Sequence, residues 1–85
     1  MAVHRDNIEG YPGSLIELAN AIGDLRYDAL AVFLRALSSK LTTDATADAG
    51  RGRPRLAASL HGGAAGLDTA AGEIERAWTI SAPHM

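Results

Sequence analysis

The feature that most constrains this chain is a five-residue break, Gly50-Arg-Gly-Arg-Pro54, between two long segments with helical apolar spacing. Inside a helix each glycine costs about 1 kcal/mol and the proline about 3 kcal/mol. The break therefore predicts a loop at residues 50–53. Pro54 is suited to the first turn of the following helix, where its missing amide hydrogen is not needed. We expect the two segments to form an antiparallel helical hairpin.

Before the break, leucines recur at intervals of four, three and four residues, at Leu30, Leu34, Leu37 and Leu41. This spacing places them on one helix face and predicts a helix over residues 25–48, with Asp24 as its N-cap. Phe33 and Ala36 widen the apolar stripe. The far end, rich in threonine and aspartate, is expected to fray before Gly50.

After the break, apolar residues recur at intervals of four and three, at Leu60, Ala64, Leu67, Ala71, Ile74 and Trp78. The pattern predicts a third helix over residues 54–79 and a C-terminal tail over 81–85. Four glycines weaken this helix, because each costs up to about 1 kcal/mol against alanine. Two interpretations stay open: a break at Gly62-Gly63, or a continuous helix in which Gly62, Gly66 and Ala70 let another backbone approach. We favour the second.

The first 13 residues show no periodicity and end in the turn-forming sequence Gly10-Tyr-Pro-Gly13, so we expect an extended or mobile arm over 1–13. Ser14 and Glu17 then have the spacing of a capping box, which predicts a short helix over 14–22. Gly23 is well placed to end it. The expected fold is one all-α domain over 14–80. A composition of 47% hydrophobic and 21% charged residues agrees with a folded chain.

The apolar side chains of the predicted hairpin are more than one seam between two helices can hide. We therefore expect a homodimer in which two hairpins form a four-helix-type core, with the first helix of each chain packed on the outside. The candidate dimer or partner interface consists of Leu30, Phe33, Leu37, Leu60, Leu67, Ile74 and Trp78.

Three of the eight basic residues, Arg51, Arg53 and Arg55, fall within five positions, and the rest of the chain has a net charge of about −5. The segment Arg51-Gly-Arg-Pro-Arg55 resembles the core of an AT-hook. The resemblance implies an extended segment in the minor groove of A·T-rich DNA. However, Gly50 stands where that family has a proline, and the flanks add no lysine. The alternative, a solvated helix-helix loop, is favoured because the acidic remainder opposes phosphate binding.

His61 lies in the predicted third helix, and a histidine in a helical hairpin resembles a histidine phosphotransfer domain. That resemblance implies an exposed histidine, but the lysine that the family places shortly after it is missing here. The alternative is a histidine at the core edge or surface with no assigned role. His4, His61 and His84 are too scattered for a metal site. No nucleophile has a base within helical reach, so we expect neither catalysis nor a cofactor.

The longest apolar run is far shorter than the roughly 20 residues that span a bilayer, so we expect no membrane contact. Charges in the first ten residues argue against a secretory signal, which makes the cytoplasm the expected location. The chain has no cysteine and hence no disulfide or thiolate site. The leading hypothesis is a small, non-catalytic interaction or scaffold module with an unidentified protein partner. The alternative is a DNA-associated accessory protein that uses the Arg-Gly-Arg-Pro loop.

Overall fold

The computed structural model describes residues 4–84, and within them every regular element is helical. The elements are α1 (Leu15–Gly23), α2 (Tyr27–Gly50), α3 (Pro54–Ser81) and a final 3₁₀ turn, η1 (Ala82–His84). The predicted all-α class is confirmed. Predictions that concern residues 1–3 and 85 lie outside the described part of the chain.

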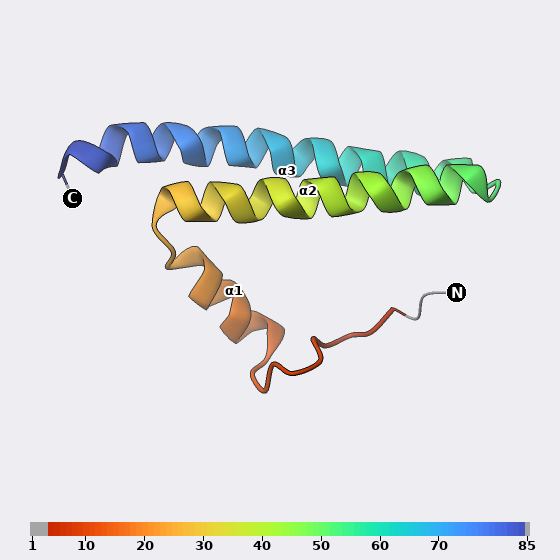
Figure 1. The fold of residues 1–85 in the computed structure, drawn as a ribbon, viewed down its shortest axis with the longest axis horizontal. Coiled ribbons are helices and arrows are strands. Elements are labelled where there is room, and N and C mark those ends of the chain that lie inside the picture. The colour runs from red at the N-terminus through yellow and green to blue at the C-terminus, as the bar shows by residue number, and fades with distance from the viewer. Residues whose placement is uncertain (1–3, 85) are drawn as a thin grey trace.

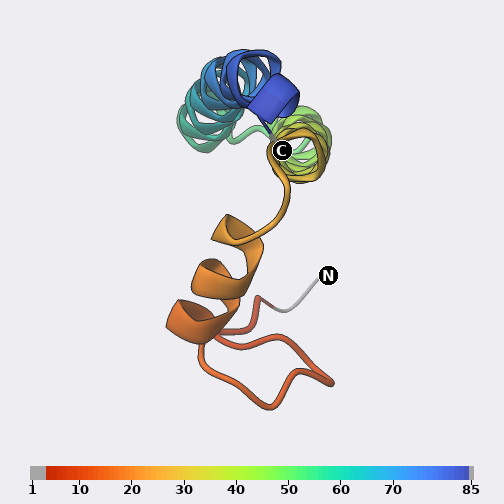
Figure 2. The same ribbon diagram turned by 90° about the vertical axis from the view of Figure 1, so that its left-hand side faces the viewer.

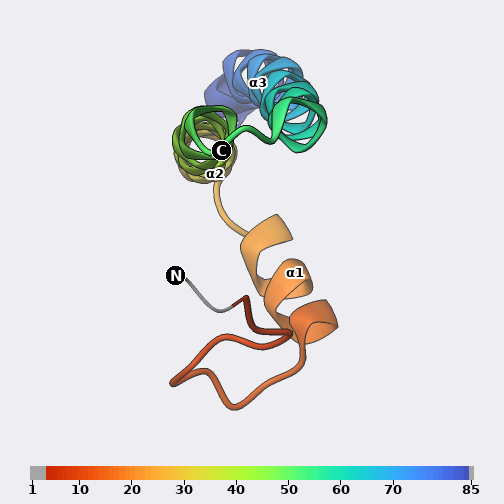
Figure 3. The same cartoon turned by 90° about the vertical axis from the view of Figure 1, so that its right-hand side faces the viewer.

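The two long helices, α2 and α3, run antiparallel side by side, as Figure 1 shows. Their loop lies at one end, and the end of α3 lies beside the start of α2 at the other. α1 points away from this pair, and the end-on views of Figures 2 and 3 show it well separated from both long helices. The overall extents are 50 × 30 × 13 Å. Within the described residues, α1 buries no side chain, so the expectation that it packs on the outside of the hairpin is not met by a single chain.

The loop between the long helices is a tight turn that closes the end of α2. Gly52 adopts the left-handed conformation, with φ of +76°. Its backbone N–H donates to the carbonyl of Ala49, and the N–H of Arg53 donates to the carbonyl of Asp48. This pair of bonds is a Schellman motif, which satisfies helix-end carbonyls. α2 is therefore helical as far as Gly50, whereas the sequence had suggested fraying before that residue.

The start of α1 has the predicted capping box. The Ser14 hydroxyl accepts from the N–H of Glu17, and the Glu17 carboxylate accepts from the N–H of Ser14. The prediction for Asp24 is wrong. Its backbone N–H closes the end of α1, and α2 follows Arg26, which gives no side-chain cap. A three-residue link, Asp24–Arg26, thus joins the two helices.

The seam between α2 and α3 consists of small residues and not of leucines. The buried residues recur every seven positions on both helices: Ala31, Ser38 and Ala45 on α2, and Ala57, Ala64 and Ala71 on α3. The predicted α2 seam is therefore wrong, because Leu30, Leu34, Leu37 and Leu41 lie beside the contact line. The physical reason is size: an alanine stripe lets two helix backbones approach more closely than leucine permits.

The third helix is continuous through Gly62-Gly63, as favoured, but its glycines do not have the predicted role. A Cβ placed on Gly62 or Gly66 would meet no heavy atom within 4 Å in the described chain. Only at Gly63 would it meet a side chain, the Leu41 Cδ1 at 3.7 Å. The close approach comes from the alanines, so the glycines at 62 and 66 are not required by packing within one chain.

Candidate functional site

The two sides of the hairpin differ in chemistry, and one of them is bridged by ions. The Arg35 guanidinium of α2 donates two hydrogen bonds, of 2.7 and 2.8 Å, to the Glu75 carboxylate of α3. It also lies 3.6 Å from Asp68, about two helical turns before Glu75 on α3. This fork-shaped contact holds α2 and α3 together along their polar side.

The same contact shifts the titration of both groups. The hydrogen bonds from Arg35 hold the pKa of Glu75 below its ordinary value, and those bonds raise the pKa of Arg35. Both side chains are about half exposed, so water and salt screen the pair. The contact therefore orients the helices more than it stabilises them.

The opposite side of the hairpin is apolar on α2 as far as Leu41. Nearer the loop, Lys40, Asp44 and Asp48 of α2 line a hollow together with Leu56 and Leu60 of α3. Leu41 reaches across to α3 there, because its Cδ1 lies beside Gly63. In a helix, the positions three and four residues after a seam residue lie on opposite sides of the seam. Leu34 and Leu41 come three residues after a seam residue and Arg35 comes four residues after one, so these leucines and Arg35 lie on opposite sides of the hairpin. We call this side the apolar face; it comprises Leu30, Phe33, Leu34, Leu37 and Leu41 of α2 with Leu56, Leu60, Leu67 and Ile74 of α3.

Most of the apolar face is open to solvent in a single chain, although His4 of the N-terminal arm lines a hollow with Leu41 and Leu56 at its loop end. Phe33 and Leu37 each keep 39% of their surface exposed, and Leu56 keeps 45%. Leu30, Leu60, Leu67 and Ile74 are half-buried. Six of the seven predicted interface residues thus lie together on one face. Contiguous exposed apolar surface of this extent marks an interaction site more often than chance exposure.

The seventh predicted interface residue, Trp78, lies elsewhere. It follows Ala71 by seven residues and so continues the seam at the open end of the hairpin. The Arg26 guanidinium lies 5.3 Å from the centre of its ring, within cation–π range. Arg26 also donates to both oxygens of Asp28, at 2.6 and 2.9 Å. Trp78 and Arg26 thereby fix the link to α1 against the hairpin.

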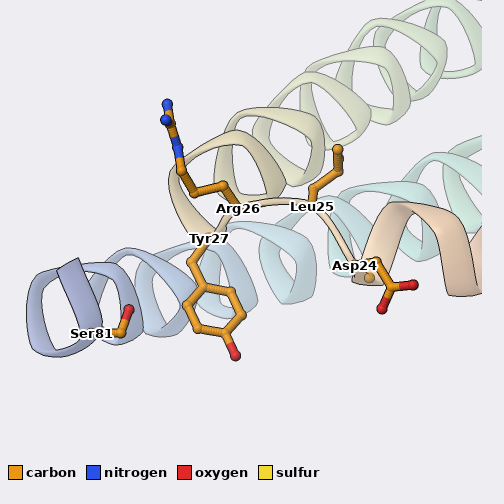
Figure 4. Close-up of a pocket in the computed structure, with 6 residues that line it drawn as sticks. Asp24, Leu25, Arg26, Tyr27 and Ser81 are labelled. Atoms are coloured by element: carbon orange, nitrogen blue, oxygen red, sulfur yellow. The ribbon is translucent and has the colours of Figure 1, made fainter. Parts of the chain in front are cut away.

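A hollow of about 500 Å³ lies where that link meets the end of α3. Figure 4 shows the Tyr27 ring and Ser81 at this hollow, with Arg26 extending in the opposite direction from Tyr27. The Ser81 hydroxyl has no hydrogen-bond partner among the described residues. Among the described residues that line the hollow, Asp24 is the one carboxylate, and no hydrogen bond joins it to the Ser81 hydroxyl.

The arginine loop, residues 51–55, is closed on its own helix. Arg51 and Arg53 each place a guanidinium nitrogen near one oxygen of Asp48, at 3.7 and 3.5 Å. That carboxylate is largely buried, with 13% of its side chain exposed, whereas both arginines stay more than half exposed. The segment is a tight turn and not the extended strand that the AT-hook resemblance implies. Contact with a minor groove would require the turn to open.

The remaining candidates for chemistry stay apart from one another. His61 is exposed on α3, and the lysine of the chain, Lys40, is paired with Asp44 on α2 at 2.6 Å. Across residues 4–84 no three histidine or carboxylate side chains gather as metal ligands would. No helix in that range is both long and apolar enough to cross a bilayer. The apolar face is therefore the strongest candidate for a functional site.

The chain was compared with known protein families, curated proteins and solved structures. No protein-family model, curated protein or solved structure matches it.

Sequence reasoning missed two features of the site. The first is the seam of small residues, whose signal was a seven-residue repeat of alanine or serine on both helices. The second is the pairing of Arg35 with Glu75, because the partner of a charge on another helix depends on the register between the helices. Once Ser38 is set opposite Ala64, the two charges fall on the same side.

Proposed function

We propose that this protein is a non-catalytic helical interaction module that associates with itself through the apolar face. In the resulting dimer, two α2–α3 hairpins would form a four-helix core. The observation that carries the proposal is the segregation of apolar side chains: nine of them lie on one side of the hairpin, opposite the Arg35–Glu75 ion pair.

The composition of the single-chain core supports the proposal. The fully buried residues among those described are five alanines and one serine. Burial contributes about 25 cal/mol per Å² of apolar surface, so alanines contribute little each, while the larger leucines stay half in water. A second apolar face laid over Phe33, Leu37 and Leu56 would remove that surface from solvent and supply the missing core.

A matched pair of variants tests the proposal. Leu37→Asp places a charge in the apolar face, whereas Val32→Asp places the same charge on the same helix but about 140° away around its axis. Val32 is the more exposed of the two, at 69%. If association depended only on how much apolar surface a residue exposes, Val32→Asp would weaken the dimer more than Leu37→Asp. We expect size-exclusion chromatography with light scattering to give a monomer mass for Leu37→Asp and a dimer mass for Val32→Asp. Equal masses for the two variants would contradict the proposal.

A second candidate function is contact with nucleic-acid phosphates through the arginine loop. It is favoured by the exposure of Arg51 and Arg53, whose side chains are 64% and 54% exposed although both lie near Asp48. It is weaker than the first because Asp48 offsets part of the charge and the turn is closed. A duplex-binding measurement, described below, distinguishes the two.

A further inference from the structure

The apolar face is too long for the chain's own first helix to cover. From Leu56 to Ile74 of α3 the face extends over 18 residue steps and is therefore about 27 Å long. α1 has nine residues and is about 14 Å long. The arrangement in Figure 1 also directs α1 away from the hairpin. A segment of matching length is needed, and the equivalent face of a second copy has it.

The face has the size that a specific contact between two copies needs. Neighbouring helices lie 8–10 Å apart, which gives two packed helices a breadth of roughly 18 Å. Over a length of about 27 Å this is roughly 490 Å² for each chain, or roughly 1,000 Å² for two. A biological interface should bury about 1,000 Å² or more in total. Two apolar faces in contact reach this lower bound, and the residues that flank them add to the buried area.

The charges of the hairpin are separated along its length. The midpoint is the contact of Ser38 with Ala64. The half near the loop, residues 39–63, has a net charge of +2, from four basic and two acidic residues: Lys40, Arg51, Arg53 and Arg55 against Asp44 and Asp48. The half near the open end, residues 24–38 and 64–84, has a net charge of −2. Of this, −1 remains when Arg35, Asp68 and Glu75, which lie on the side away from the apolar face, are left out: Asp24, Asp28 and Glu73 against Arg26 and Arg76.

This separation selects one orientation for the pair. In a parallel pair, the two loop halves would lie side by side and six arginines would gather at one end. In an antiparallel pair, each positive half lies over the negative half of the other copy. Charges at the rim of an interface favour complementary pairing and disfavour like pairing, which fixes orientation more than it adds affinity.

We infer that two copies of this chain pair antiparallel through the apolar face, with the two-fold axis near Leu37. This inference rests on the proposed self-association and adds its geometry. α2 then lies over α2 of the second copy, and Leu37 meets the same residue of that copy. The two arginine loops project at opposite ends of the dimer, so each presents its charge alone and no joint six-arginine site forms.

Distances between spin labels test the orientation, and the absence of cysteine makes each label unique. Ala49→Cys labels the loop end of α2, and Ser39→Cys labels its middle; both residues are exposed and lie off the apolar face. Neither change alters a charged residue. Position 49 is 11 residues from the midpoint at Ser38, so antiparallel pairing separates two such labels by about 33 Å along the helix axis.

The expected result of pulsed dipolar spectroscopy on the full chain is a distance of about 35 Å or more for label 49 and a distance at least about 10 Å shorter for label 39. Similar distances at the two positions would mean parallel pairing, which overturns the inference while the proposed self-association survives. No dipolar coupling at either position, together with a single-chain mass, would overturn both.

Discussion

The hydroxyl of Ser38 on α2 donates a hydrogen bond of 3.0 Å to the carbonyl oxygen of Ala64 on α3, inside the seam between the two helices. From this contact, steps of seven residues in opposite directions bring Ala31 opposite Ala71 and Ala45 opposite Ala57. A buried hydroxyl without a partner costs about 1–3 kcal/mol. The bond therefore favours this register over any that slides α2 along α3.

The first prediction concerns the size of the seam residues. Ala71 is fully buried, so Ala71→Leu forces α2 and α3 apart and lowers the free energy of unfolding by about 1–3 kcal/mol. Ala65→Leu adds the same side chain to the same helix at an exposed position and should change it little. Urea unfolding followed by circular dichroism, at one fixed protein concentration, measures both. If Ala71→Leu and Ala65→Leu had the same free energy of unfolding, the alanines would not form the contact line between α2 and α3.

The same substitution should have opposite effects at two glycines. Gly52→Ala places a side chain in the left-handed conformation and should destabilise the protein by about 1–2 kcal/mol. Gly62→Ala lies in α3 with open space around the added carbon and should stabilise it by about 0.5–1 kcal/mol. Thermal melts of the two variants report the signs. If Gly62→Ala also destabilised the protein, α3 would not be continuous at that point.

The link between Arg35 and Glu75 should make stability depend on pH. Because Arg35 lowers the pKa of Glu75 in the folded chain, the contribution of the pair is complete above the ordinary value of about 4.5. It is lost as the pH falls through the lowered pKa. We expect Glu75→Gln to lower the urea midpoint at pH 7 and to lose this difference as the pH approaches 3.

The control for that experiment is Glu73→Gln, since Glu73 pairs with Arg76 three residues further along the same helix, at 3.2 Å. This pair does not connect α2 with α3. Its loss should therefore shift the midpoint less at pH 7. A difference between wild type and Glu75→Gln that persists undiminished at pH 3 would show that the carboxylate charge is not what the contact requires.

The arginine loop should not bind A·T-rich duplex as an AT-hook does. The loop is closed by the bonds from Gly52 and Arg53 to α2, and the rest of the chain is acidic. A fluorescence titration with labelled duplex at low salt should give no dissociation constant tighter than about 10⁻⁴ M, the weak end of non-specific DNA binding. Tighter binding that is lost in an Arg51→Gln, Arg53→Gln double variant would favour the second candidate function.

How much of this fold follows from the sequence depends on the element. The capping box of Ser14 and the loop before Pro54 are local, and local signals located both. The α2 seam was mistaken because apolar periodicity marks the most hydrophobic stripe, whereas the helix contact used the stripe of small residues beside it. Leu30 and Leu37 thus do mark an apolar face of α2, but the prediction that this face forms the seam with α3 was wrong.

The candidate site divides in the same way. Six of the predicted interface residues lie on the apolar face, because the apolar spacing of each helix places its own members on one side. That they form an interface stays a prediction. The cross-helix partners Glu75 and Ala64 could not be predicted, because the register of two helices is set by tertiary contact. The position of α1 could not be predicted from the sequence either. Arg26, the last residue of the link Asp24–Arg26, contacts the ring of Trp78 on α3 and the carboxylate of Asp28, and the contact with α3 depends on the tertiary structure.

The central claim is that the apolar face is covered by a second copy. Sedimentation equilibrium of the wild-type chain, at tens of micromolar and near-physiological salt, tests it most directly. The account predicts twice the mass of one chain, falling towards the single-chain mass only on strong dilution. A single-chain mass throughout that range would contradict it.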